Sequence, residues 1–213
     1  MDQEQAFWDE IADHPNDDGP LLVYADWLDE GGHSALAESI RIGIQADDTY
    51  AGRRRQAGPL PGETAEEMLR REAGIRSRSY ELIEELKPYW KKRYKGTSPH
   101  VDYYNGLPHT MAIAAKKFLE VADDILDRGP IRSFRITMMP DYAEEVLACP
   151  TLDRVRSLDF SRSKMSSNVS LALTCKHTAS LRSLHLGGNN SLRQNDLRER
   201  LAEAHLPDRK SVV

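Results

Sequence analysis

The sequence is poor in cysteine and has no long apolar run, and both absences restrict the kind of protein it encodes. Only Cys149 and Cys175 are present among 213 residues. Two cysteines make no disulfide framework, so a reducing compartment is the simpler expectation. No apolar run approaches the roughly 20 residues that span a bilayer, and the acidic start MDQEQAFWDE shows no signal peptide. We therefore expect a cytoplasmic protein without a membrane partner.

Excess basic charge and catalytic motifs are lacking as well. The formal net charge is −5, so no overall positive field attracts nucleic acid. The sequence has no H-E-x-x-H, G-x-S-x-G, Walker or G-x-G-x-x-G motif. The glycines at 187–188 form a repeat turn, because no helix with a lysine follows to hold a phosphate. These absences predict a protein that is not an enzyme and has no organic cofactor.

The two cysteines also argue against a metal. Cys175-Lys-His177 suggests zinc, but such a site needs about four ligands and the sequence has no C-x₂-C pair. Cys149 and Cys175 are 26 residues apart, which is the spacing of the repeats described below. We therefore interpret both as small thiols that fill equivalent gaps in neighbouring repeats, and we expect no bound metal.

The first half has the apolar spacing of helices. Apolar residues recur at helical intervals within residues 3–13, 20–30 and 34–45, and glycines 31–32 end the second segment. Residues 48–63 contain three arginines among glycine and proline and predict a surface loop. Thr64 and Glu67 have the spacing of a capping box. A long helix should follow to about Leu86, with a break or kink at Pro88.

The second half repeats one phrase three times. Ile131–Ile136, Val155–Phe160 and Leu181–Leu186 begin 24 and then 26 residues apart. Periods of about 20–29 residues with this L-x-x-L-x-L core are typical of leucine-rich repeats. Each phrase predicts a short strand, and the return legs at 142–148 and 169–174 should be helical. Segments 109–126 and 192–205 are the expected caps.

Together these patterns predict an α/β protein. A helical N-terminal module, residues 1–96, is expected to pack on a short leucine-rich-repeat solenoid, residues 97–213. One repeat cannot bury its own apolar face, so stacking of neighbours must provide the core.

Residues 6–45 contain a distinctive set of residues: Ala6-Phe7, Ile11, Pro15, Asp17-Asp18, Pro20, Leu22–Glu30 with its VYADWL core, Gly32 and Ala37–Arg41. In these residues the chain resembles the bacterial repeat-companion domain, which precedes leucine-rich or other repeats in large paralogous families. This chain departs from the family at Leu21, where arginine is usual, and at Ser39, where phenylalanine is usual. Tyr80–Trp90 and Asn105–Leu107 look like segments that commonly follow. The resemblance implies a fold and a repeat context but brings no biochemical activity with it.

Tyr24, Asp26 and Trp27 in that core have two interpretations. With Asp29 and Glu30, Asp26 offers charge for a basic peptide on which Trp27 stacks. The favoured interpretation is that Tyr24 and Trp27 pack between helices while Asp26 caps or pairs nearby, because their spacing is that of core and flanking positions. Both aromatics are therefore expected to be structural anchors.

The strand phrases predict a binding face. Residues that alternate with the apolar positions point to the opposite side of the sheet, which in solenoids is the usual concave binding surface. This surface predicts a non-enzymatic scaffold that binds another protein or peptide; the alternative is that these positions are merely solvated. The candidate residues are Arg135, Asp159 and His185 in one ladder and Arg132, Arg156 and Arg182 in a second.

Two basic segments keep nucleic acid open as an alternative partner. Lys87–Lys95 interleaves cations with three aromatics, and cations pair with phosphates while aromatics stack on bases. The same segment also fits a helix end whose aromatics pack inward and whose cations favour the helix dipole. The alternative patch consists of Arg53, Arg54, Arg55, Lys91, Lys92 and Arg93.

Overall fold

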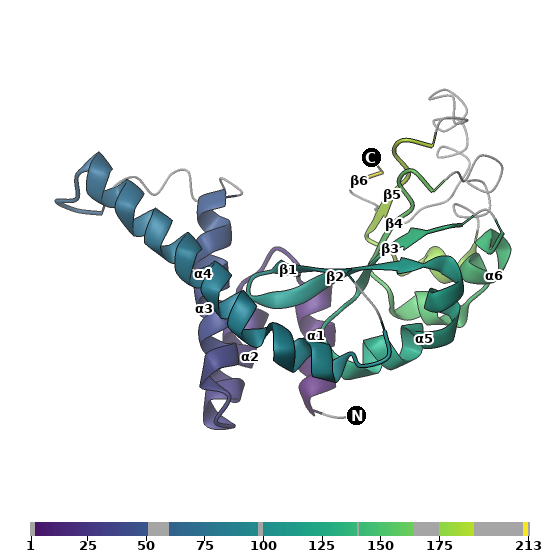
Figure 1. Ribbon diagram of the computed structural model, residues 1–213, viewed down its shortest axis with the longest axis horizontal. Helices are drawn as coiled ribbons and strands as arrows, with labels where there is room; N and C mark the ends of the chain where they lie inside the picture. The colour runs from purple at the N-terminus through teal and green to yellow at the C-terminus, as the bar shows by residue number, and fades with distance from the viewer. Residues whose placement is uncertain are drawn as a thin grey trace. The chain divides into compact units, whose positions relative to one another are not determined.

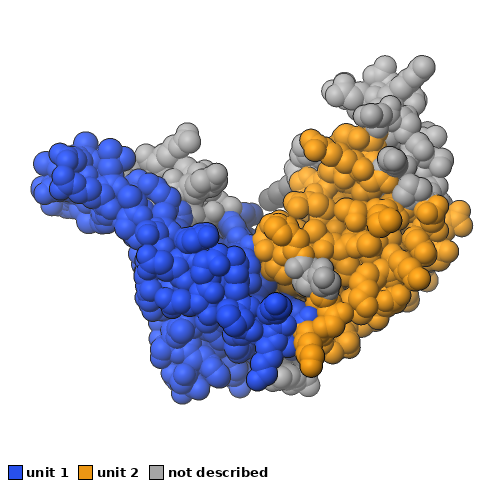
Figure 2. Space-filling view, in the orientation of Figure 1, with its two compact units in different colours: residues 1–94, 103–108 blue, residues 95–102, 109–213 orange. Residues whose placement is uncertain are grey.

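The computed structural model describes residues 3–50, 60–97, 100–139, 141–163, 175–189 and 211–212. Helices and strands are both present, so the chain is a mixed α/β protein (Figure 1). It divides into two compact units, coloured blue and orange in Figure 2. Unit 1 contains residues 1–94 and 103–108, and unit 2 contains 95–102 and 109–213. The sequence had suggested a single boundary after residue 96; the structure places the short segment 103–108 with the helices.

Unit 1 begins with the three helices that the apolar spacing predicted. They are α1 (Gln3–Asp13), α2 (Gly19–Glu30) and α3 (Ser34–Tyr50). The third helix is longer than expected and continues past Gln45. Gly32 ends the α2 turn with φ +78°, a left-handed conformation that favours glycine.

Helix α4 (Ala65–Arg93) begins at the predicted capping box. The Thr64 hydroxyl accepts from the Glu67 backbone N–H, and the Glu67 carboxylate accepts from the Thr64 N–H at 2.8 Å. The helix continues through Pro88, so the alternative of a break there was wrong. Proline removes one backbone hydrogen bond, but Leu86 and Trp90 are buried on either side of it. Their burial favours a continuous helix.

A buried polar cluster joins α1, α2 and α4. The Trp8 indole N–H donates to the Tyr24 hydroxyl at 3.1 Å, and that hydroxyl donates to Glu4 Oε1 at 2.8 Å. Arg93 closes the cluster with Nη2 2.6 Å from Glu4 Oε2 and its guanidinium carbon 4.9 Å from the Trp8 ring centre. Burial raises the pKa of Tyr24, so its hydroxyl stays protonated and able to donate.

The turn between strands β1 (His100–Tyr104) and β2 (Leu107–Ala114) packs against α3. Asn105 and Gly106 both have positive φ, 47° and 74°, as a two-residue hairpin turn of the primed type requires. The Ser39 hydroxyl donates to the Gly106 carbonyl at 3.0 Å, and this bond is buried. A Cβ at Gly43 would lie 2.3 Å from the Asn105 carbonyl carbon. Two glycines therefore allow turn and helix to approach this closely.

Unit 2 is built on a sheet with strand order β1-β2-β3-β4-β5-β6. Neighbours from β2 to β6 pair in parallel. The predicted cap 109–126 contributes strand β2 and the helix α5 (Ala115–Arg128). The return leg at 142–148 contains α6 (Ala143–Leu147), whereas 169–174 and 192–205 lie outside the described residues. The remaining elements are β3 (Ser133–Thr137), η1 (Pro150–Arg154), β4 (Ser157–Asp159), η2 (Lys176–Thr178), β5 (Ser183–His185) and β6 (Ser211–Val212).

One face of this sheet forms the core of unit 2. Met111, Phe134, Leu158 and Leu184 are in register on β2 to β5, and each is fully buried. The Phe118 ring of α5 meets Phe134 edge to face at 5.1 Å between centres. Because side chains alternate along a strand, the residues between these positions point to the opposite face. Among the described residues, no helix combines the length and apolar character needed to cross a bilayer.

Candidate functional site

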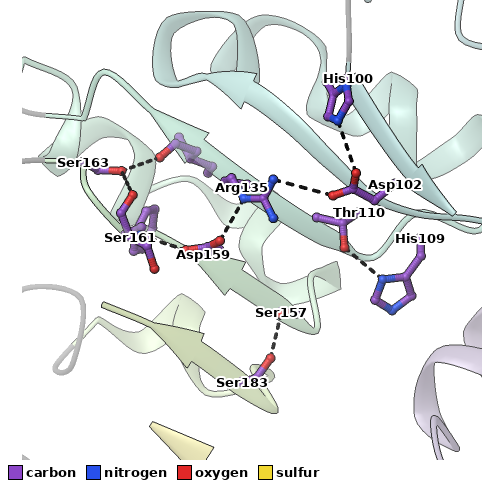
Figure 3. A network of polar contacts seen from close by, with 12 residues as sticks. His100, Asp102, His109, Thr110, Arg135, Ser157, Asp159, Ser161, Ser163 and Ser183 are labelled. Atoms are coloured by element: carbon purple, nitrogen blue, oxygen red, sulfur yellow. Dashed lines mark hydrogen bonds and ion pairs between the residues drawn. The ribbon is translucent and has the colours of Figure 1, made fainter. Parts of the chain in front are cut away.

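The candidate site is the face of the sheet opposite to α5, which we call the open face. Strand register places Arg135 beside Asp159 and Asp159 beside His185, the alignment that the repeat spacing predicted. Part of this face is shown in Figure 3. Its role in binding stays a prediction. The open face consists of Thr110, Ala112, Ala114, Ser133, Arg135, Thr137, Ser157, Asp159, Ser183 and His185.

Arg135 lies between two carboxylates at the centre of this face. Its Nε donates to Asp159 Oδ2 at 2.9 Å, and its Nη1 lies 3.5 Å from Asp102 Oδ2. Asp102 comes from β1, and its other oxygen lies 3.3 Å from His100 Nε2. The chain of contacts His100–Asp102–Arg135–Asp159 is drawn in Figure 3.

Asp159 is a fixed member of this chain. Its Oδ1 accepts from the Ser161 backbone N–H at 2.8 Å while Oδ2 accepts from Arg135. Burial alone would raise the pKa of Asp159, but hydrogen bonds from Ser161 and Arg135 outweigh burial and lower the pKa below its ordinary value. Asp159 therefore stays ionised and orients the guanidinium.

We expect the ionised Asp159 to stabilise the fold in a pH-dependent way. Its folded-state pKa is lowered, so its contribution is fully present above the unfolded pKa of about 3.9 and is lost as the pH falls through the folded value. The difference in unfolding free energy between wild type and Asp159→Asn should therefore shrink below about pH 4. Chemical denaturation across that range measures it. A difference that does not change on acidification would contradict the assignment.

Short side chains surround Arg135. On the neighbouring strand β4, Ser157 lies two residues before Asp159, the register partner of Arg135. The Ser157 hydroxyl accepts a hydrogen bond from Ser183 Oγ at 2.6 Å. On the other side the register partner of Arg135 is Ala112. Ser133 is buried, while Ser157 and Ser183 are half-buried. The guanidinium therefore lies among short hydroxyl and methyl side chains as well as beside its two carboxylates, and the Arg135 side chain is 42% exposed.

The second predicted ladder has a different role at each level. Arg132 is only 4% exposed, and its Nη1 donates to the carbonyls of Leu126, Gly129 and Ile131 at 3.2, 3.0 and 2.8 Å. Arg132 therefore satisfies carbonyl groups around the end of α5 and does not project from the open face. Arg156 is half-buried and donates to the Asp153 carbonyl at 3.2 Å, whereas Arg182 is exposed.

The alternative basic patch is not assembled in the described residues. Arg93 belongs to the buried polar cluster of unit 1, where it pairs with Glu4. Lys91 and Lys92 are exposed on the last turn of α4. Arg53, Arg54 and Arg55 lie outside the described residues.

The VYADWL core is divided between packing and ion pairing. Tyr24 is 1% exposed, while Trp27 is half-buried and stacks on Tyr24 with 5.9 Å between ring centres. Arg41 of α3 binds both carboxylates, with Nη2 2.7 Å from Asp26 Oδ1 and Nη1 bonded to Asp29. Arg41 therefore offsets one of the three negative charges of Asp26, Asp29 and Glu30 that were considered for a basic peptide.

Asp102 was not predicted from the sequence. It lies outside the three repeat phrases, and no motif marks it, because its role depends on how strand β1 joins the sheet. No group of three or more histidine, cysteine or acidic side chains that could hold a metal occurs within the part of the chain that the structure describes. Neither a family model, nor a curated protein, nor a solved structure matches the chain.

Proposed function

We propose that this chain is a non-enzymatic protein that binds another protein or peptide in the cytoplasm, through the open face of a short leucine-rich-repeat array. The single observation that carries the proposal is the open face itself. It presents one long cation, Arg135, oriented by Asp159 on a floor of short polar side chains. Such a surface suits a polar partner that is recognised by the geometry of its hydrogen bonds and ion pairs more than by a large buried area.

Two properties of unit 2 support a repeat array. The three phrases found in the sequence form strands β3, β4 and β5, which pair in parallel without a change of register. Their apolar residues Phe134, Leu158 and Leu184 are buried in line. In repeat proteins of this kind, the strand face opposite to the helices is the usual binding surface.

The proposal predicts that filling the floor prevents binding. Ser157→Trp places an indole beside Arg135, on a strand position where aromatics are tolerated. The protein is immobilised and exposed to a lysate of its source cells, and captured proteins are quantified by mass spectrometry. Partners retained by wild type should be lost from Ser157→Trp, and also from Ser183→Trp one strand along.

The matched control is Ser77→Trp, which adds the same side chain to the exposed surface of α4. It should capture as wild type does. All variants are first checked for an unchanged melting temperature. Capture that persists in both blocking variants contradicts the proposal. Nucleic acid retained through Lys91 and Lys92, and lost on their replacement by alanine, would instead favour the alternative partner.

A further inference from the structure

Resting on the function proposed above, we propose that Arg135 binds a carboxylate of the partner peptide, and that Asp102 holds this place on Arg135 until the partner displaces it. Two observations support this role: Arg135 has N–H donors beyond the one that Asp159 uses, and the two aspartates are held with unequal firmness.

Unused donors on the open face are concentrated on Arg135. A guanidinium has five N–H donors, and the Nε donor is bonded to Asp159. Asp102 lies 3.5 Å from Nη1, an ion pair without a hydrogen bond among the described residues. The Nη edge therefore has donors for an incoming acceptor, and a planar pair of such donors matches a carboxylate in a bidentate arrangement.

The two aspartates are held differently. The Asp159 side chain is 21% exposed and is fixed by the Ser161 N–H as well as by Arg135. The Asp102 side chain is 46% exposed, and its second ion-pair partner is His100, whose side chain is 76% exposed. Ion pairs this exposed contribute little to stability. Asp102 can therefore leave at small cost, while Asp159 keeps the guanidinium in position.

Space and charge both favour a carboxylate. Strand β2 separates Asp102 on β1 from Arg135 on β3, and the register partner of Arg135 on β2 is Ala112, which contributes only a methyl group. A carboxylate that replaces Asp102 restores the charge balance around Arg135 with one negative charge. A phosphate would bring about two charges next to Asp159, and a cationic group would meet carboxylates that Arg135 already partly neutralises. Exchange of Asp102 for one other carboxylate therefore leaves the charge around Arg135 unchanged, whereas a doubly charged group does not.

Three matched pools of short synthetic peptides test this inference. The pools have glutamate, glutamine or lysine at one central position and are otherwise the same mixture of small residues. Each pool is made with an amidated and with a free C-terminus. Retention on the immobilised full-length protein is measured. The amidated glutamate pool should be retained above the other amidated pools if a side-chain carboxylate binds, and the free-terminus pools should be retained alike if a chain-terminal carboxylate binds.

Opposite effects of the two aspartates are the decisive result. Asp102→Asn removes the competing carboxylate and should raise retention about 2–5-fold. Asp159→Asn should lower retention because the guanidinium loses its orientation. Arg135→Ala should lower it about 10-fold or more, and Arg135→Lys should recover only part because lysine lacks the planar fork. Asp26→Asn on α2, whose side chain is 72% exposed and paired with Arg41, is the matched control and should change nothing.

Preferential retention of the lysine pool, loss of retention in Asp102→Asn, or no retention of any pool overturns the inference. If lysate partners still depend on Ser157, the open face functions in binding and only the ligand class is wrong. If neither peptides nor lysate partners respond to Ser157→Trp, the proposed function fails as well.

Discussion

Replacing Gly106 by alanine should lower the free energy of unfolding by about 2–5 kcal/mol, because it combines backbone strain with a steric conflict. Gly106 has φ +74°, and a Cβ there would lie 2.0 Å from the Ser39 carbonyl oxygen. The conflict is with backbone, so no side chain can rotate away from it. Chemical denaturation of the full chain measures the effect, and hydrogen exchange should locate the loosening at α3 and the β1–β2 turn.

Other glycines separate the two causes. Gly62 has a similar φ of +85° but has no atom within 4 Å of its Cβ position. Gly62→Ala should therefore show strain alone, about 1–2 kcal/mol. Gly43 of α3 and Gly74 of α4 give the same comparison within helices. Gly43→Ala should lower the free energy of unfolding by about 1–3 kcal/mol, because its Cβ would clash with Asn105. Gly74 has no atom within 4 Å of its Cβ position, so Gly74→Ala should raise the free energy of unfolding by about 0.5–1 kcal/mol. Equal effects at Gly43 and Gly74 would contradict the close packing of turn and helix.

The second large effect is expected at Trp8. Its side chain is 2% exposed, so Trp8→Ala should cost about 3–5 kcal/mol through lost burial and the cavity that remains. The substitution also removes the N–H that donates to the Tyr24 hydroxyl and the ring beneath Arg93. Thermal and chemical unfolding of the variant, with wild type alongside, give the difference.

Trp27→Ala is the matched comparison. Trp27 was expected from the sequence to be an anchor, but its ring is half-buried, so its loss should cost clearly less than that of Trp8. A Trp8→Ala variant as stable as Trp27→Ala, or more stable, would show that the buried polar cluster contributes little to unit 1.

Local patterns in the sequence were sufficient to predict elements whose signal lies within a few residues. The Thr64–Glu67 capping box and the three helical segments are of this kind. The strand phrases are a second case. Apolar and polar residues alternate along each strand, and this alternation predicts that Phe134 is buried and that Arg135 points to the opposite face. Pro88 shows the limit: a local rule predicted a break or kink, but burial of Leu86 and Trp90 extends the helix beyond it.

Contacts between distant segments were not predictable from local patterns. Asp102 reaches Arg135 only because β1 joins the sheet beside β2, and Arg132 is buried because it binds the end of α5. The dipeptide Asn105-Gly106 carried a recognisable hairpin signal. Its packing against Ser39 and Gly43 required knowledge of where the turn lies in space.

Site-specific photo-cross-linking in the source cells tests most directly whether the open face binds a partner. A photoreactive amino acid is introduced singly at Thr137 or Ser183, which point to the open face from β3 and β5, or at Lys117, whose side chain is 42% exposed on α5 on the other side of the sheet. The account predicts one common partner cross-linked from Thr137 and from Ser183 and none of it from Lys117, with loss of both cross-links in Ser157→Trp. The same partner cross-linked from Lys117 alone would contradict the account.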